Sequence, residues 1–95
     1  MASKKNLKKD INLLIDDVVG TCLIRQSMEK KENQEKVNEM IKDILRFRDD
    51  MITKLNDQSV NKMDHKDRKK YFGSLYSDLL TKVNGMFDQL NAMTE

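Results

Sequence analysis

The last third of the chain carries a repeat of apolar residues that strongly limits what it can fold into. From Phe72 onward these residues recur at alternating steps of three and four positions. The series comprises Phe72, Tyr76, Leu79, Val83, Met86, Leu90 and Met93, with Leu80 and Phe87 beside it. Because an α-helix has about 3.6 residues per turn, this spacing places the whole series on one side. It predicts an amphipathic helix near 65–93, the longest and most regular of the chain.

Two further series upstream have the same helical spacing. The first comprises Leu7, Ile11, Leu14 and Val18 with Ile15 and Cys22 beside it, and the second comprises Val37, Ile41, Ile44, Met51 and Leu55. They predict helices near 4–28 and 34–56, joined by the polar stretches EKKENQ and NDQSVNKMD. Three stripes on so short a chain are most simply buried in an up-down-up three-helix bundle. We therefore expect an all-α fold, with residues 1–95 forming a single helical domain.

Arg48 occupies a position of the second series where an apolar side chain is expected. A buried guanidinium needs a carboxylate or carbonyl partner, or else its head must reach solvent along its apolar stem. We expect the second outcome. A buried ion pair with Asp10 or Asp17 is the alternative.

Composition excludes several other classes of protein. Of the residues 36% are charged, there is no proline, and the three glycines stand singly, which is not typical of sandwiches or barrels. Aspartates interrupt the apolar core that a signal peptide needs after the basic start MASKKNLKKD, and no apolar run is long enough for a membrane span. Cys22 is the only cysteine, so an intramolecular disulfide is impossible. We predict a cytoplasmic protein.

The stretch MDHKDRKKYF, residues 63–72, gathers the only histidine, two aspartates and a basic run. One histidine and one distant cysteine cannot supply the three or four protein ligands of a zinc site. We instead expect Asp64 to cap a helix by accepting a hydrogen bond from the amide of Asp67. Cys22 lies in mid-helix, far from His65, so no nucleophile and base come together. The sequence therefore predicts no catalytic, metal or cofactor site, and His65 receives no role.

The first helix is apolar on more sides than a three-helix bundle covers. Helical projection places Leu13 and Ile24 on one flank, and Val19 and Leu23 on the other. We predict self-association, most simply as a homodimer, through a face that contains Leu13, Val19, Gly20 and Leu23. The alternative is a wide contact with the core that leaves a few aliphatic side chains exposed.

Charge is unevenly distributed in the predicted bundle. The pole formed by the starts of the first and third helices and the end of the second holds 12 basic and 6 acidic side chains, while the rest of the chain holds 6 basic and 10 acidic ones. Eight of these 12 basic residues lie at the starts of the first and third helices and form the candidate contact surface, which we call the basic pole: Lys4, Lys5, Lys8, Lys9, Lys66, Arg68, Lys69 and Lys70. It could be a solvated surface, or it could contact an acidic protein partner or the acidic end of another copy.

Nucleic acid or another polyanion is the competing partner of the basic pole, through phosphate contacts. Six aspartates mixed into the pole oppose this interpretation, and both connections are too long for a helix-turn-helix. Phe72 belongs to the apolar series, so it is not free to stack on a base.

The segments KKNLKKDIN, residues 4–12, and YFGSLYSDLLTKVNGMFDQLN, residues 71–91, resemble a family of small uncharacterised all-helical proteins from Bacteroidetes. The resemblance covers about half of the chain and implies an all-α domain without an assigned activity. Together with the residue patterns, it leads us to expect a non-enzymatic helical interaction module that self-associates through its first helix.

Overall fold

The structure is a computed structural model, and it describes residues 4–93. Four helices follow one another along the chain: α1 (Lys4–Met28), α2 (Lys31–Asn56), α3 (Gln58–Lys62) and α4 (His65–Ala92). The described part of the chain contains no strand, so the predicted all-α class is confirmed. The described residues form one helix more than the three expected, because the second connection itself contains the short helix α3.

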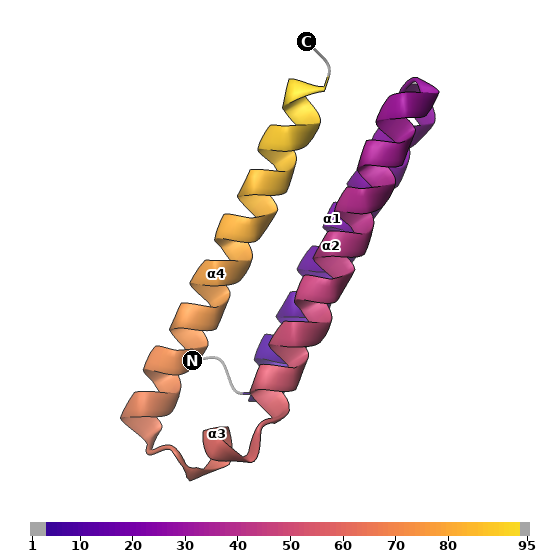
Figure 1. The fold of residues 1–95 in the computed structure, drawn as a ribbon. Coiled ribbons are helices and arrows are strands. Elements are labelled where there is room, and N and C mark those ends of the chain that lie inside the picture. The colour runs from indigo at the N-terminus through magenta and orange to yellow at the C-terminus, as the bar shows by residue number, and fades with distance from the viewer. Residues whose placement is uncertain (1–3, 94–95) are drawn as a thin grey trace.

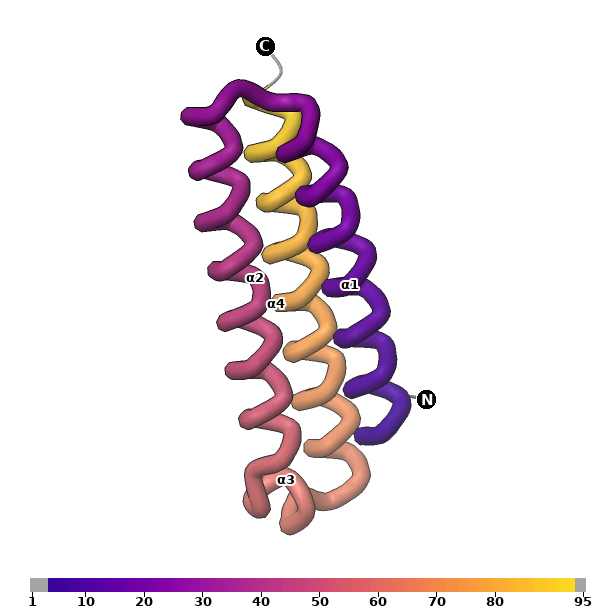
Figure 2. The backbone as a smooth tube through the Cα atoms, turned by 90° about the vertical axis from the view of Figure 1, so that its right-hand side faces the viewer, coloured from indigo at the N-terminus to yellow at the C-terminus, as the bar shows by residue number. Residues whose placement is uncertain are grey.

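The three long helices run along a common axis (Figures 1 and 2), and their buried side chains form one core. In Figure 2, α1 and α2 lie side by side and α4 lies behind them. The α1–α2 connection lies at the end where α4 finishes, whereas α3 closes the opposite end, where α1 and α4 begin. We call these the upper and lower ends. The Cα trace extends 50 × 19 × 15 Å, which gives a narrow rod.

The core consists only of apolar side chains among the described residues. Each long helix contributes one stripe at helical spacing, as the sequence predicted. The buried residues are Leu7, Ile11, Ile15, Val18 and Cys22 from α1, Val37, Ile44, Met51 and Leu55 from α2, Val60 from α3, and Phe72, Leu75, Leu79, Val83, Met86 and Leu90 from α4.

The edges of the stripes differ from the prediction. Leu75, outside the predicted α4 series, is buried, whereas Tyr76 and Leu80 are each 40% exposed. Because residues on the same helix are separated by about 100° per position, exchanging Tyr76 for Leu75 turns the buried stripe by one residue. The α4 stripe is therefore centred slightly away from Tyr76, and this side chain remains at its margin.

The α1–α2 connection is shorter than the sequence indicated. Only Glu29 and Lys30 separate the two helices, because α2 begins at Lys31 instead of near residue 34. Two glutamine side chains, one from the end of α1 and one from the predicted loop, bind backbone carbonyls at this turn. Gln34 Nε2 donates to the Glu29 carbonyl at 3.0 Å, and Gln26 Nε2 donates to the Gln34 carbonyl at 2.9 Å.

Arg25 fastens α1 to the end of α4 at the upper end of the rod. One of its terminal nitrogens donates to the Leu90 carbonyl at 3.2 Å. This carbonyl is among the last of α4 and also accepts from the backbone amide of Met93, which caps the helix. Its Nε lies 3.5 Å from a Glu29 carboxylate oxygen, an ion pair whose geometry falls short of a hydrogen bond.

Substitution of a core leucine should show how much the stripes contribute to stability. Leu55→Ala removes a fully buried side chain of α2, and we expect it to lower the free energy of unfolding by about 2–5 kcal/mol. Leu45→Ala, on the half-buried margin of the same helix, should cost about half as much. Urea titrations followed by circular dichroism measure both values. Equal losses would contradict the assigned core.

Candidate interaction surfaces

The described residues expose six large hydrophobic side chains, four of which belong to α1. Leu13 is 56% exposed, Leu23 52%, Ile24 67% and Met28 77%. A helix in a bundle of three normally turns such side chains toward its two neighbours. The exposed α1 residues therefore form the most distinctive surface of the molecule.

The four residues predicted for self-association do not all share one surface. Leu13 and Leu23 are exposed, and Gly20 is half-exposed. Val19 is half-buried and packs against the core. The most exposed α1 residues, Ile24 and Met28, lie outside the predicted set, although helical projection from the sequence already placed Ile24 on the flank of Leu13.

Polar contacts show which side of α1 faces each neighbour. Lys8 donates to the Asn56 side chain of α2, and Gln26 donates to Asn38 of α2 at 2.6 Å. At about 100° per residue, Lys8 and Gln26 lie in the same direction, and Leu23 is closer to them than Leu13 or Ile24 is. Leu23 is thus on the α2 side.

Leu13, Ile24 and Met28 lie on the other flank of α1, on the side of α4. On α4, Lys82 marks the side of α2, because its ammonium lies 2.5 Å from an Asp43 carboxylate oxygen and 5.8 Å from the Phe47 ring centroid. Helical projection places Tyr76 and Leu80 away from Lys82, and hence toward α1. We call the surface shared by Leu13, Ile24, Met28, Tyr76 and Leu80 the α1/α4 face.

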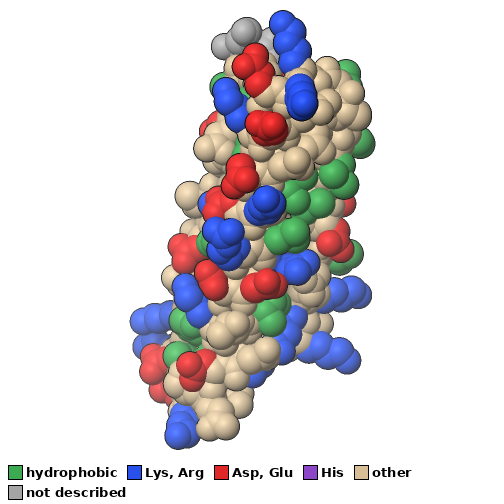
Figure 3. Space-filling model, turned by 45° about the vertical axis from the view of Figure 1, so that its right-hand side comes forward, with side chains coloured by type: hydrophobic (Ala, Val, Ile, Leu, Met, Phe, Trp, Pro, Cys, Tyr) green, Lys and Arg blue, Asp and Glu red, His purple; other side chains and the backbone are tan. Residues whose placement is uncertain are grey.

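The basic pole lies at the lower end, where Figure 3 shows basic side chains projecting beyond both edges with acidic ones among them. On the upper part of the same view, charges of both signs alternate, and hydrophobic side chains gather where α1 and α2 meet. Five lysines of the pole are exposed and Lys4 and Lys8 are half-exposed; the exposed ones are Lys5, Lys9, Lys66, Lys69 and Lys70.

Arg68 differs from the other members of the basic pole because its guanidinium is occupied within the chain. Its Nε donates to the Val60 carbonyl at 3.3 Å, and a terminal nitrogen donates to the carbonyls of Asn61 and Met63 at 3.2 and 3.1 Å. These carbonyls lie at the end of α3, where no further helical turn follows; that of Val60 also accepts from the backbone amide of Met63. Arg68 is therefore a structural residue that holds α3 against α4.

The aspartates near the basic pole cap helices. The Asp64 carboxylate accepts from the Asp67 amide at 2.8 Å, as the sequence predicted. The Asp57 carboxylate accepts from the Ser59 amide at 2.9 Å at the start of α3. This backbone hydrogen bond holds the pKa of the Asp57 carboxyl below its usual range, because it stabilises the charged form.

The residues considered for chemistry remain apart. Cys22 is buried in the core, and burial raises the pKa of its thiol because the thiolate would lose its hydration. His65 is exposed at the start of α4. Within residues 4–93, no group of three or more metal-ligating side chains comes together. Arg48 is half-exposed and reaches solvent, where a terminal nitrogen lies 3.4 Å from Asp49 Oδ1, so the expected exit along its stem is confirmed.

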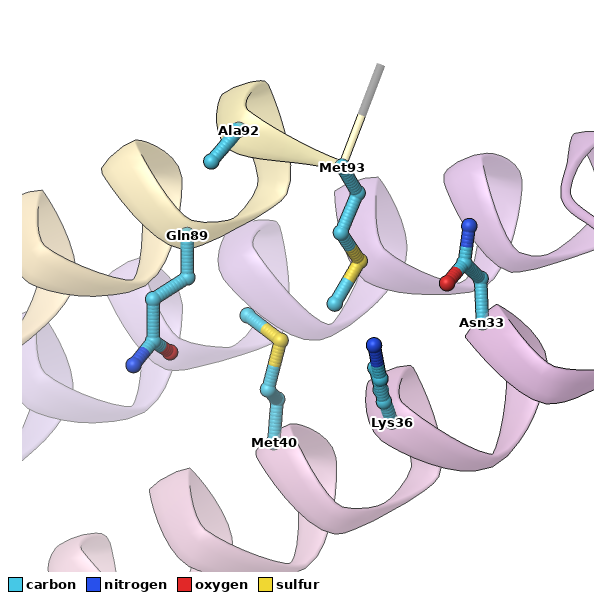
Figure 4. A pocket seen from close by; sticks show the side chains of 6 residues that line it. All are labelled: Asn33, Lys36, Met40, Gln89, Ala92 and Met93. Carbon is cyan, nitrogen blue, oxygen red and sulfur yellow. The ribbon is translucent and has the colours of Figure 1, made fainter. Parts of the chain in front are cut away.

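An open depression of about 580 Å³ lies at the upper end between α2 and α4. Met40 and Met93 point toward one another across it, and the amine of Lys36 lies beside them (Figure 4). The remaining lining residues are Asn33, Gln89 and Ala92. Lys36 is the one titratable side chain of this lining, so the lining offers no acid and base in combination.

No protein-family model, curated protein or solved structure matches this chain. The resemblance to small Bacteroidetes proteins therefore stays a prediction. Across residues 4–93, every helix is too short or too polar to cross a bilayer.

Removal of the Arg68 side chain should distinguish a structural residue from a surface charge. We expect Arg68→Gln to lower the free energy of unfolding by about 1–2 kcal/mol, because three carbonyls lose a charged donor. Lys70→Gln removes the same charge at an exposed site and should change stability by less than about 0.5 kcal/mol. Thermal and urea unfolding measure both. Equal effects would show that only the charge matters.

Proposed function

We propose that the protein is a non-enzymatic interaction module of the cytoplasm that self-associates through α1. The observation that carries this proposal is the exposure of Leu13, Leu23, Ile24 and Met28 on one helix, each more than half exposed. Single exposed aliphatic residues are common on monomeric proteins, but a cluster on one helix is typical of an interface.

A second copy of the chain is a suitable partner because both copies carry the same exposed apolar surface, so each can cover that of the other. In a two-fold dimer, each copy buries the same patch against the other. Burial of apolar area contributes about 25 cal/mol per Å², so several large side chains covered at once provide a substantial driving force. Every long helix already has its core stripe satisfied within the chain, so association would add to the fold without rearranging it.

Charged residues at the exposed α1 positions should dissociate the oligomer while leaving the fold intact. We expect the triple variant Leu13→Glu, Leu23→Glu, Ile24→Glu to be monomeric at concentrations where the unmodified protein is dimeric, because carboxylates cannot be buried without a partner. Size-exclusion chromatography with light scattering measures the molar mass, and circular dichroism checks the helix content.

A matched control adds the same three charges elsewhere. Thr53, Ser74 and Thr81 are exposed on the outward sides of α2 and α4, and Thr53→Glu, Ser74→Glu, Thr81→Glu should remain dimeric. If the control dissociates as fully as the α1 variant, net charge and not the α1 surface governs association. A monomeric unmodified protein would contradict the proposal itself.

Polyanion binding through the basic pole is the second candidate function, supported by the five exposed lysines Lys5, Lys9, Lys66, Lys69 and Lys70. Two features oppose it. Arg68 is occupied by carbonyls of the chain, and Tyr71 and Phe72, which could have stacked on bases, are half-buried and buried. An acidic protein partner would use the same lysines.

Heparin chromatography tests this second candidate. If the basic pole binds polyanions, we expect retention that falls steeply with salt and that Lys69→Glu with Lys70→Glu abolishes, because phosphate or sulfate contacts release counterions. Lys31→Glu with Lys42→Glu, at exposed positions of α2 outside the pole, is the matched control. Elution in the flow-through at low salt would contradict polyanion binding.

A further inference from the structure

We propose that a second copy of the chain covers the α1/α4 face in antiparallel orientation, so that α1 packs on α1 and α4 on α4 of the other copy. This inference rests on the proposed self-association. Beyond self-association through α1, it states that α4 contributes to the interface, that the α2 side of α1 does not, and that the two rods run in opposite directions.

The α1/α4 face is the strongest candidate surface because it holds five of the six exposed large hydrophobic side chains of the described residues. Only Leu23 lies elsewhere, on the α2 side of α1. The Cα trace of the rod extends 50 × 19 × 15 Å, and the side chains widen each long side beyond the trace. A stable interface takes about 800 Å² from each partner, so a face of this size is sufficient.

Charge selects the orientation. The lower end carries 12 basic and 6 acidic side chains, and the remainder carries 6 basic and 10 acidic ones. A parallel dimer would place the two basic ends side by side, and like charges brought together oppose association. An antiparallel dimer places the basic lower end of each copy beside the more acidic upper part of the other.

The positions of individual charges on α4 agree with this arrangement. Lys69 and Asp88 are both exposed; Lys69 points in nearly the same direction as Leu80, whereas Asp88 lies at the outer margin of this side, about 80° further round the helix. They lie nine and ten residues from residue 78, the midpoint between Tyr76 and Leu80. A two-fold axis at this midpoint brings Tyr76 of one copy to Leu80 of the other, and it places each Lys69 at the same height along the rod as the other copy's Asp88.

Gly73 on the same side of α4 is compatible with this packing. A Cβ atom at this position would meet nothing within 4 Å in the chain, so the fold itself does not need glycine there. Glycine in a helix interior costs up to about 1 kcal/mol relative to alanine. Close approach of a helix from outside the chain gives this glycine a use.

The orientation is tested by a distance between spin labels attached to Lys66→Cys in each copy. In the antiparallel dimer the two labels lie 24 residues apart along the axis, or about 36 Å, because an α-helix rises about 1.5 Å per residue. Electron paramagnetic resonance should therefore give a distance of about 30 Å or more between the two labels. A separation shorter than about 25 Å would show a parallel dimer and overturn the proposal. Unmodified protein is the control, since buried Cys22 should take up no label.

The charge pairing is tested by exchange. We expect Lys69→Asp and Asp88→Lys each to weaken dimerisation about three- to tenfold at low salt, and the double variant to recover most of the loss. Lys42→Asp, on an outward-facing position of α2, should leave the dissociation constant unchanged. Additive weakening in the double variant would overturn the pairing of Lys69 with Asp88.

Single substitutions separate failure of this inference from failure of the proposed function. Leu80→Glu on α4 should dissociate the dimer, while Leu23→Glu on the α2 side of α1 should leave it intact. The opposite result would show self-association through a different face. A monomeric unmodified protein would overturn both the inference and the proposed function.

Discussion

A helix with only two long helical neighbours can bury a stripe of its surface but not its whole circumference. α2 and α4 largely conform, with one buried stripe and mostly polar residues opposite it. α1 buries its stripe too, yet it also exposes Leu13, Leu23, Ile24 and Met28. α1 therefore carries more apolar surface than its two helical neighbours cover, and the proposals for this protein follow from this uncovered surface.

The two ends of the rod are held by arginines that satisfy helix carbonyls. Arg25 binds the end of α4 from α1, and Arg68 binds the end of α3 from α4. Arg68 therefore does not contribute to the surface of the basic pole in the way that its position in a run of basic residues suggested. The exposed lysines around it remain, and in the antiparallel dimer they lie beside the acidic part of the other copy.

The sequence predicted the parts of the fold that depend on helical periodicity. The stripe from Phe72 to Leu90 predicted α4, and Asp64 predicted where that helix begins. The sequence did not predict α3, because a five-residue helix has no room for a repeat; its signals were Asp57 as a cap and Val60 as a single apolar residue. The α1–α2 turn was expected to be longer, since the side-chain contacts of Gln26 and Gln34 are invisible to periodicity.

The candidate site could be predicted only in part for a similar reason. Helical projection identified α1 as too apolar and placed Leu13 beside Ile24, but it could not say which flank faces α4. That assignment required contacts between helices, such as Lys8 with Asn56 and Lys82 with Asp43. Val19 illustrates the limit, since it lies near the edge of the stripe and only the packing of the folded chain decides that it is half-buried against the core.

Small-angle X-ray scattering of the unmodified protein tests the central claim most directly, because it gives mass and length together. A lateral antiparallel dimer predicts twice the chain mass of 11.2 kDa with a longest dimension close to that of one rod, whose Cα trace is 50 Å long. A mass of 11.2 kDa at every concentration would contradict self-association. A dimer close to twice the length of one rod would contradict the lateral packing of α1 and α4.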